Sequence, residues 1–272
     1  MIVPARPSRR LDATPKPKQL TLYLAVALVL LFLVAPILII VPISFSSAQY
    51  LKFPPPGFSL QWYRHFFGRP EWMASLWLSV RVATLSTVLT TILGVLASLA
   101  LVRGRFRGKS VVYAVILSPM IVPTIITAIA VFFFFARLHL VGSAVAMALG
   151  HTVVALPLVV IIVSATLQGF DRRLEQAAIS LGASPLTAFR RITLPLIAPG
   201  VISGALFAFL TSFDELLIPL FLAGPTSQTL PVRIWNSVIM QIEPTIAAVS
   251  SFLIGVAILV MLLAALVQRV RQ

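Results

Sequence analysis

The sequence predicts an all-α membrane protein with six transmembrane helices. Of its 272 residues, 59% are hydrophobic and only 10% are charged, whereas a soluble domain carries roughly a quarter charged residues. So few charges cannot cover a globular surface, and lipid must therefore surround much of the chain. A helix of about 20 apolar residues spans a bilayer core, and six segments are long enough. They are residues 21–43, 73–102, 111–135, 144–168, 197–223 and 245–267.

The first apolar segment follows a basic tail, residues 1–20, which is rich in proline and arginine and lacks apolar periodicity. We expect this tail to lie on the cytoplasmic side, near anionic lipid headgroups. The apolar run after it is too long for the hydrophobic region of a signal peptide, and no small-residue cleavage site follows. Residues 21–43 are therefore interpreted as an uncleaved membrane helix, and residues 21–268 as one six-helix transmembrane domain.

The loops between the spans predict the orientation, because Lys and Arg are enriched on the cytoplasmic side of membrane proteins. If the N-terminus is cytoplasmic, fifteen basic residues lie inside and five lie outside. Both ends of the chain are then expected in the cytoplasm. The net charge of +14 is thus a property of the inner loops, and it does not indicate a nucleic-acid partner. The outer basic residues are Lys52, Arg64, Arg69, Arg137 and Arg233.

The loop at residues 104–110 contains glycine and lysine but does not match a phosphate-binding loop. Such a loop follows a β-strand and has four residues between its first glycine and its Gly-Lys pair. This loop has three residues there and follows a membrane helix. Cysteine is absent, and the three histidines lack the spacing of metal ligands. We therefore expect no enzyme activity, metal or cofactor in this chain, and any nucleotide hydrolysis in another chain.

Residues 171–195 form a polar loop between the fourth and fifth apolar segments. Asp171 can cap a helix that begins at the next residue, and Gly182 is placed to end that helix in the left-handed conformation. Ser184, followed by proline, has the residue types that begin a second short helix. That second helix is expected to end near Ile192.

The spacing of the polar loop resembles the EAA loop of permease subunits of binding-protein-dependent ABC importers, whose pattern is E-A-A-x3-G-x9-I-x-L-P. One position departs, because Gln176 stands where the family has glutamate, with Glu175 beside it. In that family the loop is a short helical element that docks into a groove on a cytoplasmic ATPase. The resemblance therefore assigns ATPase coupling to Glu175, Gln176, Ala177, Ala178, Gly182, Ile192, Leu194 and Pro195.

A second stretch narrows the resemblance to one branch of these permeases. From Ser212 the chain reads S-F-D-E-L-L-I-P-L-F-L-A-G-P, and from Thr229 it reads T-L-P-V-R-I-W. Both resemble the second permease subunit of spermidine/putrescine importers. Members of this branch also move 4-aminobutyrate, opines and ferric ion, so these solutes stay open as alternatives.

The resemblance implies a type I ABC importer permease fold with a cytoplasmic coupling helix, in the bacterial inner membrane. It implies a heterodimer with a second permease, two cytoplasmic ATPase subunits that bind the ATP, and a periplasmic solute-binding protein. Transport would proceed by alternating access. A secondary transporter and a channel remain alternatives of another class, although the sequence shows neither the internal repeat nor the filter motif often found in them.

Two acids, Asp214 and Glu215, fall inside the fifth predicted span, where a carboxylate is costly and points to function. Counted from the outer end of the span, Asp214 lies about 12 Å deep at 1.5 Å per residue, and Arg81 lies at a similar depth in the second span. An ion pair with Arg81 is the structural alternative for one acid, and it leaves the other free. We therefore expect Asp214 or Glu215 to attract a cationic solute, with Phe213 and Trp235 along the same path.

The fifth span also carries small residues at four-residue intervals, a pattern that lets helices pack closely in lipid. The partner helix can belong to this chain or to a second permease, and the sequence leaves both open. The small residues are Gly200, Gly204, Ala208 and Ser212.

Overall fold

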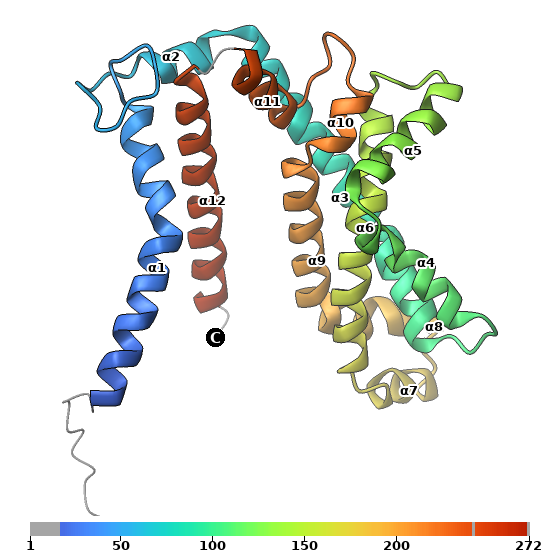
Figure 1. Ribbon diagram of the computed structural model, residues 1–272. Helices are drawn as coiled ribbons and strands as arrows, with labels where there is room; N and C mark the ends of the chain where they lie inside the picture. The colour runs from blue at the N-terminus through green and yellow to red at the C-terminus, as the bar shows by residue number, and fades with distance from the viewer. Residues whose placement is uncertain (1–16, 241–242, 271–272) are drawn as a thin grey trace, which may run out of the picture. The chain divides into compact units, whose positions relative to one another are not determined.

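The computed structural model describes the backbone of residues 17–240 and 243–270, and the side chains of residues 21–240 and 243–259. Within these ranges every regular element is a helix (Figure 1), apart from one antiparallel bridge between Ser46 and Phe58. This confirms the all-α prediction. The elements are α1 (Pro17–Ser44), α2 (Gln61–Gly68), α3 (Pro70–Arg103), α4 (Lys109–Ile121), α5 (Thr124–Arg137), α6 (Ala144–Gln168), α7 (Arg173–Ser180), α8 (Pro185–Ala188), the π-helix η1 (Phe189–Thr193), α9 (Leu194–Asp214), α10 (Leu217–Leu222), α11 (Leu230–Met240) and α12 (Thr245–Val270).

The chain divides into two compact units, one of residues 67–241 and one that joins residues 1–66 to residues 242–272. In the second of these, α1 and α12 lie side by side (Figure 1). Phe66 of α2 is fully buried, and its ring centroid lies 5.7 Å from that of Phe252 of α12. Most of the predicted basic tail lies outside the described residues.

The unit of residues 67–241 is built around three long helices, α3, α6 and α9, each of which contacts the other two. The small residues of α9 all lie buried. Gly200 faces Thr166 of α6, and Gly204 faces Val159 of the same helix. The small-residue pattern therefore packs α9 against α6 within this chain, which answers the question that the sequence left open.

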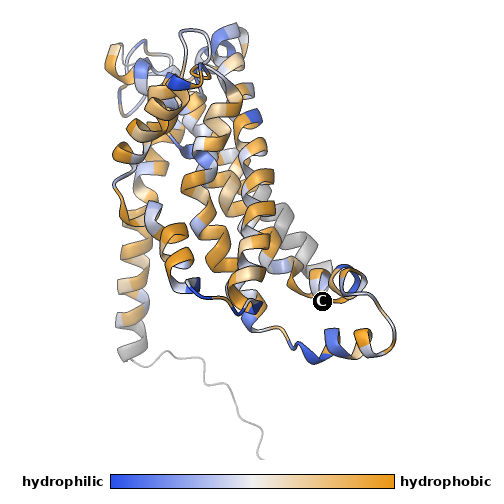
Figure 2. Ribbon diagram, turned by 90° about the vertical axis from the view of Figure 1, so that its right-hand side faces the viewer, coloured by the Kyte–Doolittle hydropathy of each residue, from blue (hydrophilic) through white to orange (hydrophobic). Residues whose placement is uncertain are grey.

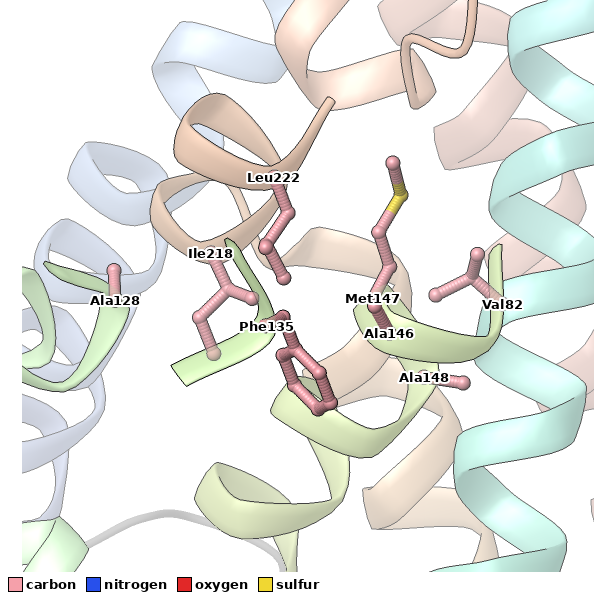
Figure 3. Packing of buried hydrophobic residues seen from close by; sticks show 8 residues of the cluster. All are labelled: Val82, Ala128, Phe135, Ala146, Met147, Ala148, Ile218 and Leu222. Atoms are coloured by element: carbon pink, nitrogen blue, oxygen red, sulfur yellow. The ribbon is translucent and has the colours of Figure 1, made fainter. Parts of the chain in front are cut away.

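A hydrophobic cluster joins α3, α5, α6 and α10 at one end of this unit (Figure 3). Gly150 of α6 makes room for α10, because a β-carbon at Gly150 would lie 2.8 Å from the side chain of Ile218. The opposite end of the unit carries α7 and α8 (Figure 1). The cluster consists of Val82, Ala128, Phe135, Ala146, Met147, Ala148, Ile218 and Leu222.

The third predicted span, residues 111–135, is not one continuous helix. It forms α4 and α5, whose axes differ by 106° across a short break. Val122 at the break is extended, with φ −75° and ψ 132°, because a residue before proline is disfavoured in the helical region. Pro123 also has no N–H to continue the helical hydrogen bonds.

The fifth predicted span, residues 197–223, is also interrupted. Helix α9 ends at Asp214, Glu215 is extended with φ −67° and ψ 122°, and α10 follows. Pro219 contributes to the break, because in a continuous helix its ring would clash with the carbonyl group of Glu215, four residues earlier.

All six predicted apolar segments are helical, although not all are single rods. Four helices of the described chain are long and apolar enough to cross a membrane, or five spans if α4 and α5 count as one. Helix α12 has 26 residues, of which Thr245–Leu259 is the apolar part that the side-chain description covers. Figure 2 shows hydrophobic residues along the long helices and hydrophilic residues mainly at their ends and in the connections.

Candidate functional site

The polar loop, residues 171–195, begins with the capped helix that the sequence predicted. The Asp171 carboxylate accepts a hydrogen bond of 2.9 Å from the backbone N–H of Arg173, where α7 begins. At the other end Gly182 has φ +93°, the left-handed conformation that glycine adopts without strain. Its N–H donates to the Ile179 carbonyl at 2.9 Å. Both local predictions are thus confirmed, with the helix starting one residue later than expected.

The second helix of the loop begins as predicted but does not end at Ile192. Ser184 caps it by accepting a hydrogen bond from the N–H of Thr187. The backbone then stays helical through η1 into α9, so that Pro185–Asp214 forms one continuous helical segment. The prediction of an end near Ile192 is wrong, because the wider π-turn of η1 carries the helix past Pro195, which has no N–H.

Glu175 is held by residues from two other segments of the chain. Arg103, the last residue of α3, binds both carboxylate oxygens, at 2.7 Å from Nη2 and 3.1 Å from Nη1. The hydroxyl of Thr193 donates to the same carboxylate at 2.8 Å. The Arg103 guanidinium also lies 5.7 Å from the ring centroid of Phe170, just beyond α6. The Arg103–Glu175 contact is the one ion pair in the described part of the chain.

The other residues that the resemblance assigned to the loop lie nearer the surface. Gln176 and Ala177 of α7 are exposed and Ala178 is half-buried, while Ile192 is half-buried and Leu194 and Pro195 are exposed. Three further apolar side chains of α7 and its turn extend into solvent: Leu174, Ile179 and Leu181, with exposed fractions of 50%, 42% and 89%. Exposed apolar side chains on a surface helix are typical of docking sites.

The two acids of the fifth span differ in their surroundings. Glu215 turns back on its own chain, where one carboxylate oxygen accepts hydrogen bonds from the N–H groups of Leu217 at 2.9 Å and Ile218 at 3.2 Å. It therefore caps α10. Asp214, the last residue of α9, is exposed.

Asp214 also ends an uncovered stripe along α9. Residues on this stripe recur every three or four positions, so they share one face of the helix, opposite the buried small residues. Within the unit of residues 67–241, the described residues leave this face exposed. The stripe consists of Pro199, Ser203, Leu206, Leu210 and Asp214.

The ion pair between Arg81 and one of these acids, which the sequence suggested, is not formed in the described chain. Arg81 is exposed on α3, and the Glu215 carboxylate is taken by backbone donors. Similar depth in the membrane was the basis of that expectation, but depth does not fix the direction in which a helical side chain points.

The two aromatic residues expected near the acids occupy different elements. Phe213 is half-buried and stacks on Phe209, one turn earlier in α9, with centroids 5.8 Å apart. Trp235 lies on α11 with 42% of its surface exposed. Its neighbour Arg233 donates to the Ser75 hydroxyl at 2.9 Å and thereby ties α11 to α3.

Sequence reasoning missed Arg103 and Thr193. Arg103 was counted only as one of many inner basic residues, and Thr193 was an unassigned position between two pattern residues. Thr193 is fully buried, and a buried hydroxyl needs a hydrogen-bond partner. That burial was the missing signal, and it arises only when η1 packs in the folded chain.

Comparison with known proteins agrees with this geometry. Residues 90–272 match the family described as the binding-protein-dependent transport system inner membrane component. The putrescine transport system permease protein PotI of Escherichia coli is 36% identical over 231 residues, which cover 82% of each chain. The spermidine/putrescine transport system permease protein PotC of Haemophilus influenzae is 33% identical over 238 residues, 88% of this chain and 92% of the relative.

A solved structure shows the same fold. It is a bacterial ABC transporter involved in the import of the acidic polysaccharide alginate, and it superimposes with a TM-score of 0.71 over 96% of this chain and 99% of the other, at 15% identity. This confirms the importer permease fold that the resemblance implied. The family match and the two relatives show that this chain belongs to the binding-protein-dependent transport system inner membrane components, the membrane-spanning permease subunits of ABC importers.

Proposed function

We propose that this permease carries a small cationic solute of the polyamine class, and that Asp214 is its cation contact. The uncovered Asp214 carboxylate at the end of α9 is the observation that carries the proposal. A carboxylate inside a membrane protein normally faces a partner charge or a pathway. Glu215 is engaged in capping α10, so of the two acids Asp214 is the one available to a solute.

The relatives support this choice of solute. PotI is a putrescine permease and PotC a spermidine/putrescine permease, according to their names. Both solutes are organic amines that carry positive charge at neutral pH. A solute with two or more ammonium groups matches an uncovered acid better than an anion does, because like charges at short distance repel.

The energy for transport comes from partner subunits. The chain pairs with a second permease, and the face of α9 that ends at Asp214 meets the pathway between them. Two ATPase subunits bind the ATP, so this chain needs no cofactor, and a periplasmic binding protein delivers the solute. Both termini and the polar loop lie on the cytoplasmic side of the bacterial inner membrane, because basic residues gather there.

Helix α7 is the contact with the ATPase in this proposal. Its exposed apolar residues Leu174, Ile179 and Leu181 offer apolar contacts to a groove on the partner, and the caps at Asp171 and Gly182 keep the helix intact as it is moved.

Uptake by cells tests the proposal. Cells with the partner subunits, with and without this chain, are given labelled spermidine, putrescine, 4-aminobutyrate and ferric ion. Polyamine uptake that depends on this chain supports the proposal. Uptake of 4-aminobutyrate or ferric ion instead keeps the importer and contradicts the polyamine assignment.

Two further measurements distinguish an ABC importer from other classes of transport protein. Co-purification with an ATPase distinguishes it from a secondary transporter or a channel. Dependence of uptake on the binding protein distinguishes an importer from an exporter.

A further inference from the structure

The Glu175 carboxylate lies at a junction of four segments. Arg103 reaches it from the end of α3 and Thr193 from η1, while Phe170 lies against the guanidinium group. The Arg103 and Glu175 side chains are each only 16% exposed. A two-point arginine–carboxylate pair with little solvent contact fixes the relative direction of the two side chains.

This junction ties α7 to the rest of the unit by polar contacts. No side chain of α7 is fully buried, so hydrophobic packing does not anchor the helix as it anchors α3, α6 and α9. Besides the two short loops at its ends, α7 is held through Glu175 to Arg103 and Thr193.

Glu175 and its sequence neighbour Gln176 have separate roles. Gln176 stands at the glutamate position of the family pattern, yet it is exposed on α7. Glu175 points to the membrane helices and does not share the outward surface. An acid at position 175 is therefore needed for a contact inside this chain, whereas position 176 faces the partner that docks on the loop.

We propose that Glu175 is a positioning residue that locks α7 to α3 and to the start of α9 through Arg103 and Thr193. Movement of α7 is then passed to both membrane helices as one rigid step. This inference rests on the proposed function, because it assumes that α7 receives its movement from a partner ATPase.

Hydrogen-bond chemistry predicts that glutamine cannot replace Glu175. The ionised carboxylate only accepts, and it receives donors from Arg103 on both oxygens and from Thr193 on one. An amide would turn an N–H₂ group towards one of these donors. Glu175→Gln therefore breaks the lock while changing neither the size of the side chain nor the caps of α7.

The first test measures the number of labelled spermidine molecules transported per ATP hydrolysed by the complete transporter in proteoliposomes. We expect Glu175→Gln and Arg103→Gln to lower this ratio about tenfold, with ATP hydrolysis retained, because each leaves a charge or acceptor without its partner. Arg107→Gln is the matched control, since Arg107 is an exposed arginine of the next loop. An unchanged ratio in Glu175→Gln overturns the inference.

Exchange of the two charges guards against a simple folding defect. The double variant Arg103→Glu with Glu175→Arg restores the pair in reverse, and we expect it to recover most of the ratio lost in either single variant. A double variant no better than the singles contradicts a lock between these two residues.

Position can also be measured directly, because the chain contains no cysteine. Spin labels at Ser180→Cys of α7 and Leu96→Cys of α3, both exposed sites, report the distance between the helices in the assembled transporter with cysteine-free partners. We expect a narrow distance distribution with Glu175, a broad one with Glu175→Gln, and a narrow one again in the charge exchange. Equal widths in all three contradict the inference.

Failure of the proposed function gives a different result. If the unaltered transporter does not couple ATP hydrolysis to uptake, the proposed function is wrong. If it couples and Glu175→Gln couples equally well, only the positioning role of Glu175 is wrong.

Discussion

Gly200 of α9 faces Thr166 of α6 so closely that a β-carbon at Gly200 would overlap the Thr166 side chain. Thr166 is β-branched and its hydroxyl donates to the Ile162 carbonyl at 2.9 Å, so it has little freedom to move aside. The close approach of the two backbones holds α9, and with it Asp214, in place.

Gly200→Ala is therefore expected to destabilise the purified chain by about 1–3 kcal/mol, the usual cost of overpacking a filled interface. Thermal unfolding in detergent measures this. Gly255→Ala in α12 is the control, because a β-carbon there meets nothing within 4 Å. Equal melting temperatures for the two variants would show that the helices do not pack as described.

Glu215 is expected to act through its cap on α10. Glu215→Ala removes the acceptor for two backbone N–H groups and should cost about 1 kcal/mol, as loss of a helix cap does. Glu215→Gln keeps an oxygen at that place and should cost less. Hydrogen exchange of the Leu217 and Ile218 amides distinguishes the two, with protection falling only in Glu215→Ala. The same protection in both variants would rule out the cap.

Gly182 tests whether the shape of the polar loop matters for coupling. Its φ of +93° is unfavourable for any residue with a β-carbon, yet open space surrounds it. Gly182→Ala should therefore strain the turn by about 1–2 kcal/mol without a clash. We expect the Gly182→Ala transporter to move fewer solute molecules per ATP hydrolysed than the unaltered transporter.

Gly108 provides the matched control for this variant. It also has a positive φ, +84°, with open space around it, but it lies in the loop between α3 and α4. Gly108→Ala imposes similar strain outside the polar loop, and its coupling ratio should stay normal. Equal losses in both variants would mean that the effect is a general loss of stability.

Local features of the site were predictable from the sequence. The Asp171 cap, the left-handed Gly182 and the Ser184 cap each depend on a few neighbouring residues, and all three are present in the structure. The breaks at Val122 and Glu215 had only a partial local signal in Pro123 and Pro219, because Pro157 and Pro199 lie inside unbroken helices. Long apolar runs concealed that signal, because hydropathy does not distinguish a straight span from a bent one.

Contacts between distant segments were not predictable in the same way. Arg103 and Glu175 lie 72 residues apart, and nothing in either local sequence identifies the other as a partner. The pairing of Arg81 with an acid failed for a related reason, since depth in the membrane was known and helix rotation was not. The packing of α9 against α6 likewise required the folded chain.

The initial rate of labelled spermidine uptake by Asp214→Asn, at matched amounts of transporter in the membrane, tests the central claim most directly. Asparagine keeps the size of the side chain and removes its charge. The account predicts a loss of about tenfold or more, the effect of removing one partner of a close charge pair, and a smaller loss for Glu215→Gln. Uptake by Asp214→Asn at the rate of the unaltered transporter would contradict the account.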